Sequence, residues 1–148
     1  MKRVNEYKKL FNVEGPLDLK ILKTNYRNLV KEWHPDKFQA WDAKAEEAEQ
    51  VSRKIIDGYH FLVSIAPETI EQNLPKYKET LESCSIVDYK HKGLLLQVVF
   101  SDGTKYEYFG VSRNAFLKFD ASDKQMRFGK RNIFFSHTYR KVKEEQAV

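Results

Sequence analysis

The sequence has a single cysteine, Cys84, among its 148 residues. One thiol cannot form an intramolecular disulfide, and no histidine stands near it at the spacing of a metal site. We therefore expect no disulfide, no metal and no cofactor. Cys84 itself is interpreted as a small packed residue.

Long apolar runs are also missing. None approaches the roughly 20 residues that a membrane-spanning helix needs. The opening residues, Met1 to Glu6, lack the apolar stretch of a secretory signal. These features predict a soluble cytoplasmic protein that binds no membrane.

Sequence patterns of independent catalysis are absent as well. The chain has no glycine-rich phosphate loop, no paired catalytic acids, no Cys-His pair and no serine-centred elbow. The histidines His91 and His137 stand in polar surroundings without carboxylate or cysteine spacing for a metal, and we assign them no role. The sequence therefore favours a binding protein over an enzyme.

The net charge of +5 is unevenly distributed. Residues 1–84 carry 14 basic and 14 acidic side chains, whereas residues 85–148 carry 12 basic and 7 acidic ones. A basic surplus in one half is compatible with an anionic partner such as nucleic acid, but it also describes an ordinary solvated surface. Charge alone leaves both interpretations open.

The hydrophobic period changes once along the chain. Apolar spacing is helical from Val4 to Leu81 and turns into short β-rich runs from Ile86 to Phe109. We predict two small domains: an all-α helical hairpin over residues 1–66, a helical connector over 67–84, and a small α+β domain with an antiparallel sheet over 85–148.

The helical half has clear boundary signals. A short helix is expected near Asn5 to Phe11, and two longer helices should begin after the N-caps Asp18 and Asp42. The residue before a proline avoids the α conformation, so the helix after Asp18 should stop at about Trp33 or His34. Each long helix has one apolar stripe and should pack against the other as an antiparallel hairpin. The stripes are Leu19, Leu22, Tyr26, Leu29 and Trp33, with Val30 widening the first, and Ala48, Val51 or Ser52, Ile55, Tyr59 and Leu62.

A basic row follows a separate face of the first long helix, and a polar loop follows that helix. Four cations, Lys20, Lys23, Arg27 and Lys31, recur at steps of three and four residues. The loop, residues 34–41, begins with His34-Pro35-Asp36 and should project from one end of the hairpin. Further along, Pro67 should open another helix, and Pro75 should end or kink it.

The second half of the sequence is predicted to form a small sheet. Strands are expected over residues 85–89, 94–100 and 105–109, with a final strand near 139–142. Lys92-Gly93 and Asp102-Gly103 supply the turns, and Asp-Gly between β-rich runs is a good hairpin signal. One short helix, capped by Ser112, should run to about Phe119.

The segment Tyr26 to Lys37, which reads YRNLVKEWHPDK, resembles the second helix and the His-Pro-Asp turn of the J-domain family. Residues 7–13 and 55–62 resemble the family's first and third helices, in the same order. The resemblance covers residues 4–65 and implies a co-chaperone that stimulates the ATPase of a DnaK-type chaperone. It implies that the contacts are made by His34, Pro35, Asp36, Tyr26, Lys23, Arg27 and Lys31.

The physical properties of these residues are compatible with a protein-binding role even without the family resemblance. Pro35 stiffens the corner from which His34 and Asp36 project, and the basic row can attract an acidic partner surface over a distance. The alternative is that His-Pro-Asp is only a helix-ending turn and that the row is a solvated face. The chain lacks the Gly/Phe-rich linker and zinc-binding cysteine pairs of larger co-chaperones, so any handling of client proteins falls to the second half.

The second half, from about Ile86 to Val142, resembles the KTSC domain. The resemblance rests on Tyr106-Glu-Tyr108, on Gly110-Val111 and on residues 128–139 with Asn132-Ile133. It implies RNA as a candidate partner. Tyr106 and Tyr108 share one strand face and either stack on bases or pack under the helix, the interpretation that we favour. Candidate phosphate contacts nearby are Lys105, Arg113, Lys130, Arg131 and Arg140.

Overall fold

The computed structural model describes residues 2–39 and 41–142, and of Lys2 and Pro35 it describes the backbone alone. The chain divides into two compact units, Lys2–Thr69 and the residues from Ile70 onward. The first unit is helical and the second contains a small antiparallel sheet with helices, as the sequence predicted. The boundary lies within the first turn of a helix, so each unit is described separately.

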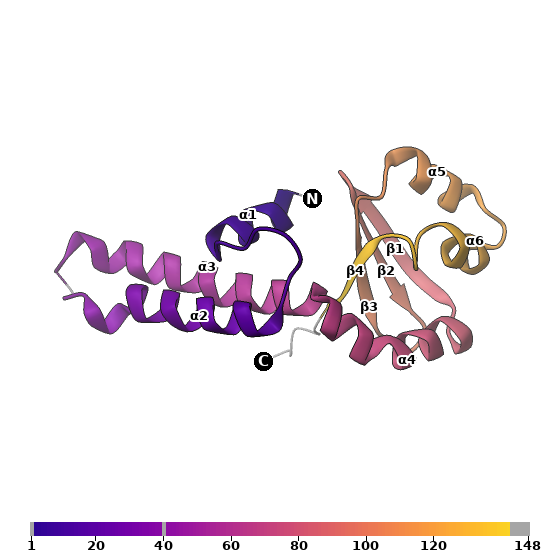
Figure 1. Ribbon diagram of the computed structural model, residues 1–148. Coiled ribbons are helices and arrows are strands. Elements are labelled where there is room, and N and C mark those ends of the chain that lie inside the picture. The colour runs from indigo at the N-terminus through magenta and orange to yellow at the C-terminus, as the bar shows by residue number, and fades with distance from the viewer. Residues whose placement is uncertain (1, 40, 143–148) are drawn as a thin grey trace. The chain divides into compact units, whose positions relative to one another are not determined.

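Over its described residues, 2–39 and 41–69, the helical unit contains three helices, a 3₁₀ turn and the start of a fourth helix (Figure 1). Both predicted caps are present: an Asp18 carboxylate oxygen accepts from the Lys20 amide at 2.8 Å, and an Asp42 carboxylate oxygen accepts from the Lys44 amide at 3.0 Å. The elements are α1 (Lys2–Leu10), α2 (Leu19–Trp33), η1 (Pro35–Lys37), α3 (Ala43–Ile65) and α4 (Pro67–Ser83).

Helices α2 and α3 form the expected antiparallel hairpin, but α3 carries two packing faces instead of one. Tyr59 stacks on Tyr26 of α2, with ring centroids 4.2 Å apart. An adjoining face, with Gly58 and Phe61, packs against α1, where Phe61 lies 5.3 Å from the ring of Tyr7. A Cβ at Gly58 would lie 2.7 Å from the Tyr7 ring, so glycine is required for this close approach.

The helix that begins at Pro67 does not end at Pro75, which corrects one of the two expected effects of that proline. Pro67 does open it, but the helix continues through Pro75 to Ser83. Pro75 and Glu71, whose carbonyl loses its amide partner, are both exposed, so water can replace the missing hydrogen bond. On the other side, Tyr77 and Leu81 are buried in the core of the second unit. The segment expected to be a connector therefore forms part of a folded unit.

The second unit is built on a four-stranded antiparallel sheet with strand order β1-β2-β3-β4. Gly93 and Gly103, the turn glycines, have φ of 63° and 88°, which favours glycine at both hairpin positions. Ser112 caps the predicted helix by accepting from the Ala115 amide at 3.1 Å. The elements are β1 (Ile86–Lys92), β2 (Leu95–Phe100), β3 (Lys105–Phe109), α5 (Arg113–Ala121), α6 (Gln125–Asn132) and β4 (Thr138–Val142).

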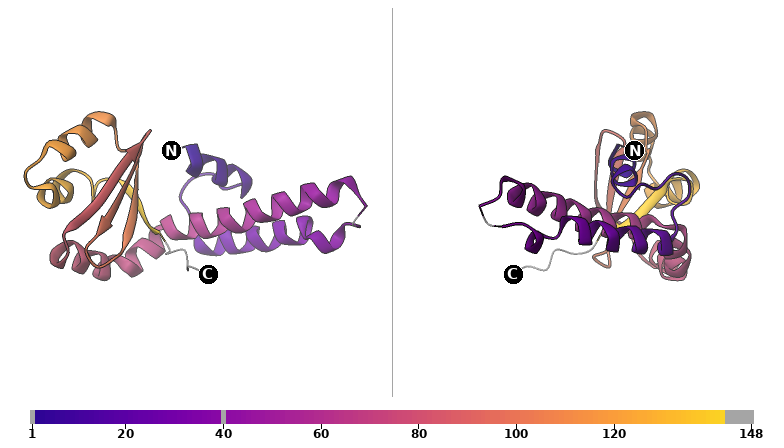
Figure 2. Two further views of the ribbon diagram at one scale, coloured as in Figure 1. Left: turned by 180° about the vertical axis from the view of Figure 1, so that it is seen from behind. Right: turned by 60° about the vertical axis from the view of Figure 1, so that its left-hand side comes forward.

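Three helices cover one face of this sheet. Figure 2 shows α4, α5 and α6 on the same side of the strands, and the core cluster includes residues from these helices, the strands and the loop after α6. Helix α6 was not predicted, because Gly129 lowers its helix propensity and its cap, Lys124, makes no side-chain hydrogen bond. In the fold that glycine is needed: a Cβ there would lie 2.4 Å from the Phe134 ring.

Candidate functional site

The His-Pro-Asp turn lies at one end of the α2–α3 hairpin (Figure 1). Helix α2 ends at Trp33, and His34 has φ −59° and ψ 130°, the extended conformation expected before a proline. The next three residues form η1, in which the Lys37 amide donates to the His34 carbonyl at 3.0 Å. The backbone therefore makes an ordered corner between the two helices.

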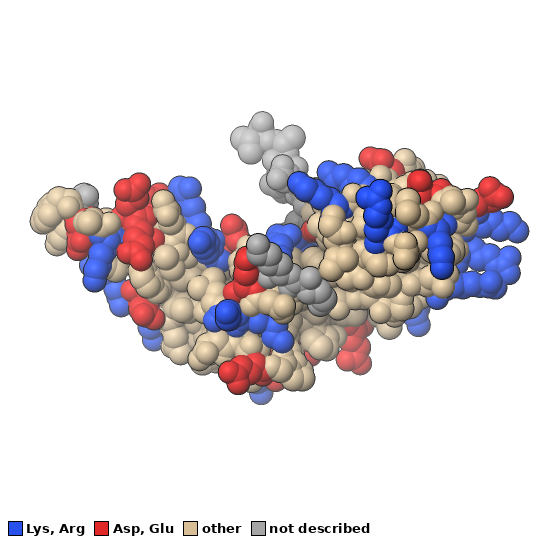
Figure 3. Space-filling model, turned by 90° about the horizontal axis from the view of Figure 1, so that it is seen from above, with Lys and Arg blue, Asp and Glu red and all other residues tan. Residues whose placement is uncertain are grey.

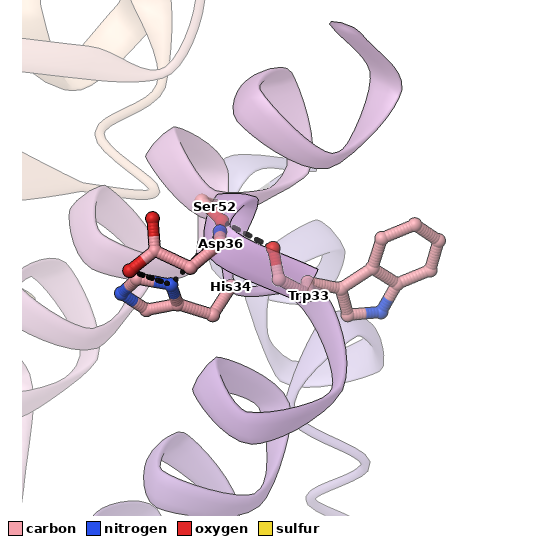
Figure 4. Close-up of polar contacts among 4 residues, drawn as sticks. All are labelled: Trp33, His34, Asp36 and Ser52. Atoms are coloured by element: carbon pink, nitrogen blue, oxygen red, sulfur yellow. Dashed lines mark hydrogen bonds and ion pairs between the residues drawn. The ribbon is translucent and has the colours of Figure 1, made fainter. Parts of the chain in front are cut away.

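The two polar side chains of the turn are exposed. The His34 side chain is 49% exposed and that of Asp36 is 91% exposed. The Asp36 amide donates to His34 Nδ1 at 3.2 Å, and the Asp36 carboxylate lies 3.5 Å from the same nitrogen (Figure 4). A neutral ring that accepts at Nδ1 carries its proton on Nε2. His34 can thus offer an N–H donor, and Asp36 a carboxylate, to another molecule.

The predicted basic row is on the surface of α2. Lys20, Lys23, Arg27 and Lys31 are all exposed. Tyr26, in contrast, is half-buried because its ring stacks on Tyr59. The turn and the basic row therefore present polar groups to solvent, while Tyr26 contributes mainly to helix packing.

A hydroxyl from α3 lies against the end of α2, a contact that the sequence did not reveal. Ser52 Oγ donates to the Trp33 carbonyl at 2.8 Å (Figure 4). In the sequence Ser52 was only an alternative to Val51 in the packing stripe. The position of Ser52 in the sequence predicted the helix face on which it lies. No sequence pattern predicted that its hydroxyl would bond a carbonyl on another helix.

Tyr106 and Tyr108 are buried, which confirms the favoured interpretation that they pack in the core and corrects the alternative that they stack on RNA. Tyr106 is 5% exposed and Tyr108 is fully buried, so neither ring face is open to a base. The Tyr77 hydroxyl donates to the Phe134 carbonyl at 2.8 Å and lies 2.8 Å from the Tyr108 hydroxyl. Tyr77 also stacks on Tyr139, with centroids 4.2 Å apart. The tyrosine cluster, Tyr77, Tyr106, Tyr108 and Tyr139, is a core element.

The five basic residues proposed as phosphate contacts differ in their surroundings. Arg113 and Arg131 are exposed, and Lys105 and Lys130 are half-buried. Arg140 pairs with Glu107 on the neighbouring strand, with Nη1 and Oε1 3.1 Å apart and side chains 13% and 5% exposed. This buried pair corrects the assignment of Arg140, because breaking a buried ion pair to bind a phosphate is costly.

Helix α6 places several basic residues close together, a grouping that was not predicted from the sequence. It carries Arg127, Lys130 and Arg131, and exposed Lys124 is its cap. On the face shown in Figure 3, basic side chains project from this unit with acidic ones among them. The unpredicted helix therefore adds Arg127 and Lys124 to the candidate anion-binding residues.

Within the described residues, no group of three or more His, Cys, Asp or Glu side chains could hold a metal ion. A search of the same residues also finds no helix that is long and apolar enough to cross a membrane.

The tyrosine cluster makes the second unit sensitive to alkali. Burial raises the pKa of Tyr106 to about 12, and burial with the nearby Tyr108 raises the pKa of Tyr77 further. A folded pKa above the unfolded value means that these neutral phenols stabilise the fold fully below about pH 10 and progressively less above it. We expect the second unit to lose stability progressively as the pH rises from about 10 through the raised pKa of Tyr106, about 12.

Tyrosinate absorbance and near-ultraviolet circular dichroism, recorded in one alkaline titration, check this expectation. The rise in absorbance from these tyrosines should accompany the loss of the aromatic dichroism. Complete ionisation of every tyrosine near pH 10 with an unchanged dichroism spectrum would contradict the burial.

Comparison with known protein families concerns the second unit. Residues 82–136 match the family described as the KTSC domain. The match leaves out Tyr77 and Leu81 of α4 and all of β4, although α4 and β4 contribute to the same core. No J-domain family matches the helical unit, and a search of curated proteins found no relative of the chain. The C-terminal unit is thus similar to the KTSC domain, as its sequence predicted.

Proposed function

We propose that this protein is a J-domain co-chaperone of the cytoplasm that binds a DnaK-type chaperone and stimulates its ATPase. The observation that carries the proposal is a solvent-exposed His34–Asp36 turn at the end of a helix with an exposed basic row. The resemblance of residues 4–65 to the J-domain family supplies the partner class.

The two surfaces suit different parts of the interaction. The exposed cations of the basic row attract an acidic surface over a distance comparable to the Debye length, about 8 Å at physiological salt. The turn acts at short range, where an imidazole donor and a carboxylate can specify one orientation. The protein itself performs no bond chemistry in this proposal. It changes the rate at which its partner hydrolyses ATP.

Single-turnover ATP hydrolysis by a DnaK-type chaperone from the same organism tests the proposal directly. We expect the wild-type chain to accelerate hydrolysis in a concentration-dependent, saturable way. An unchanged hydrolysis rate at saturating concentrations of the chain would refute the co-chaperone function.

The basic row should act through the association rate. Lys23→Ala and Arg27→Ala each remove an exposed charge, so we expect slower association with the chaperone, a nearly unchanged dissociation rate, and an effect that shrinks as salt is added. Stopped-flow or surface-based binding kinetics at several salt concentrations measure this. Lys54→Ala, an exposed lysine on α3, is the matched control. Defects that persist at high salt would show that the two residues make close contacts instead.

A second candidate function is RNA binding by the C-terminal unit. The observation that favours it is α6, which brings Lys130 and Arg131 together with Arg127 on one short helix. The burial of Tyr106 and Tyr108 removes the proposed stacking surface, so this candidate now depends on phosphate contacts. Such binding would be weak and insensitive to sequence.

For this candidate we expect an RNA affinity no tighter than micromolar that falls as salt rises, because phosphate contacts release counterions. Replacing Lys130 and Arg131 by alanine should weaken it further. Fluorescence anisotropy with a labelled single-stranded RNA at low salt measures both effects, with Lys118→Ala on α5 as the control. No binding by the wild-type chain at low salt would eliminate the RNA alternative.

A further inference from the structure

The Ser52 hydroxyl departs from the usual behaviour of serine in helices. Within a helix, serine commonly bonds a carbonyl of its own preceding turn. Ser64 and Ser83 do this here, donating to Phe61 O at 2.5 Å and to Glu79 O at 2.7 Å. Ser52 instead donates across the hairpin to Trp33, on α2. Its hydroxyl therefore links two helices at the point where α2 ends.

The Trp33 carbonyl has lost its usual partner because of the turn. In a continuing helix it would accept from the amide four residues later, which belongs to Lys37. The Lys37 amide bonds the His34 carbonyl instead, and the Asp36 amide bonds His34 Nδ1. Pro35 has no amide hydrogen to offer. Because the amides of the turn bond other acceptors, Ser52 supplies the hydrogen-bond donor for the Trp33 carbonyl.

The position of Ser52 also argues for a polar role. It lies in the packing stripe of α3 between Ala48 and Ile55, which are both fully buried. A hydroxyl in such a stripe buries less apolar area than a larger side chain would. Its contact with the last residue of α2 explains why a polar group stands there.

We propose that Ser52 is a positioning residue of the His34–Asp36 turn. Its hydrogen bond fixes the end of α2 and with it the direction in which His34 and Asp36 leave the helix. The inference rests on the proposed co-chaperone function, since it assigns Ser52 the task of presenting that docking surface. Ser52 itself is half-buried and acts through the turn.

Removing the hydroxyl should reduce function more than folding. Ser52→Ala replaces serine by a better helix former, so the hairpin should persist. The turn then occupies its docking orientation for a smaller fraction of the time, and the apparent affinity falls by that fraction. Since the net value of one hydrogen bond corresponds to a modest factor, we expect chaperone stimulation at sub-saturating concentrations to fall roughly three- to tenfold.

Two further variants separate positioning from general stability. Ser52→Thr keeps the hydroxyl and should retain most of the stimulation. Ser64→Ala removes a side chain to backbone hydrogen bond from the same helix, away from the turn, and should stimulate like the wild type. Trp33 fluorescence would report any disturbance of hairpin packing in Ser52→Ala. In that case the stimulation by Ser52→Thr decides whether Ser52 positions the turn. An inactive threonine variant with intact packing would overturn the proposal.

A second readout does not depend on the chaperone. Amide hydrogen exchange at Asp36 and Lys37, followed by nuclear magnetic resonance, should accelerate in Ser52→Ala and remain unchanged in Ser64→Ala. Unchanged exchange at both amides would overturn the positioning role, and so would wild-type stimulation by Ser52→Ala. If the wild-type chain does not stimulate the ATPase but exchange responds as expected, the proposed function fails while the structural effect of Ser52 on the turn stands.

Discussion

Replacing His34 by glutamine, or Asp36 by asparagine, is expected to reduce stimulation of a DnaK-type ATPase at least tenfold while leaving the protein folded. Both side chains project into solvent, so each substitution should change the free energy of unfolding by only about half a kcal/mol. In the complex, each would remove a desolvated interfacial contact worth on the order of 2 kcal/mol or more, which corresponds to a factor of ten or greater.

Single-turnover hydrolysis measures the loss, and thermal unfolding confirms that the variants are folded. Matched controls make the same chemical changes elsewhere on the hairpin: His60→Gln and Asp57→Asn alter exposed residues of α3 and should stimulate normally. Stimulation by the His34 and Asp36 variants equal to that of wild type would mean that the motif is only a helix-ending turn.

Replacing Tyr77 by alanine is expected to destabilise the C-terminal unit by about 4 kcal/mol, a large part of the stability of a small domain. The substitution removes a buried ring and withdraws the hydroxyl shared by Tyr108 and the Phe134 carbonyl. Both polar groups would then be buried without that partner. The milder Tyr77→Phe keeps the ring and should cost about 2 kcal/mol, because only the hydrogen bonds are lost.

The distribution of aromatic residues lets each unit be followed separately. The two tryptophans, Trp33 and Trp41, both belong to the helical unit, so tryptophan fluorescence reports that unit during urea unfolding. The resonances of the core tyrosines report the other. In Tyr77→Ala the tyrosine transition should move to lower urea, and the tryptophan transition should move little. Lys78→Ala, at an exposed neighbouring position on α4, is the control.

This experiment also decides the role of α4. If Tyr77→Ala left the tyrosine transition unchanged, the core contacts of α4 would contribute little to the stability of the unit. The expected shift would instead establish that the unit needs residues before position 82, where the family match begins.

The local signals of the sequence predicted the order and type of most elements. Asp18, Asp42 and Ser112 were identified as helix caps, and each accepts the expected backbone hydrogen bond. Asp102-Gly103 predicted a hairpin turn that is present. These features depend on neighbours within a few residues, so a single sequence contains the information needed to predict them. The exposed positions of His34, Asp36 and the basic row follow from the same local patterns.

Other features depend on residues that are distant in the sequence. Gly129 argues locally against a helix, but the Phe134 ring packs so closely against it that only glycine fits. Pro75 argues locally for a helix end, but the residues that follow it, Tyr77 and Leu81, pack in the core as part of the same helix. The sequence could place Tyr106 and Tyr108 on one face but could not show that this face is the covered one.

The sequence by itself determined where most helices and strands begin, which helix face is basic and which residues form the corner between the two long helices, because backbone conformation and periodicity are local properties. Only the tertiary structure decided which donors and acceptors meet. It joined Ser52 to Trp33, Arg140 to Glu107 and Tyr77 to Tyr108. Such pairs form because burial requires each polar group to find a partner, and the partner available depends on how the elements pack.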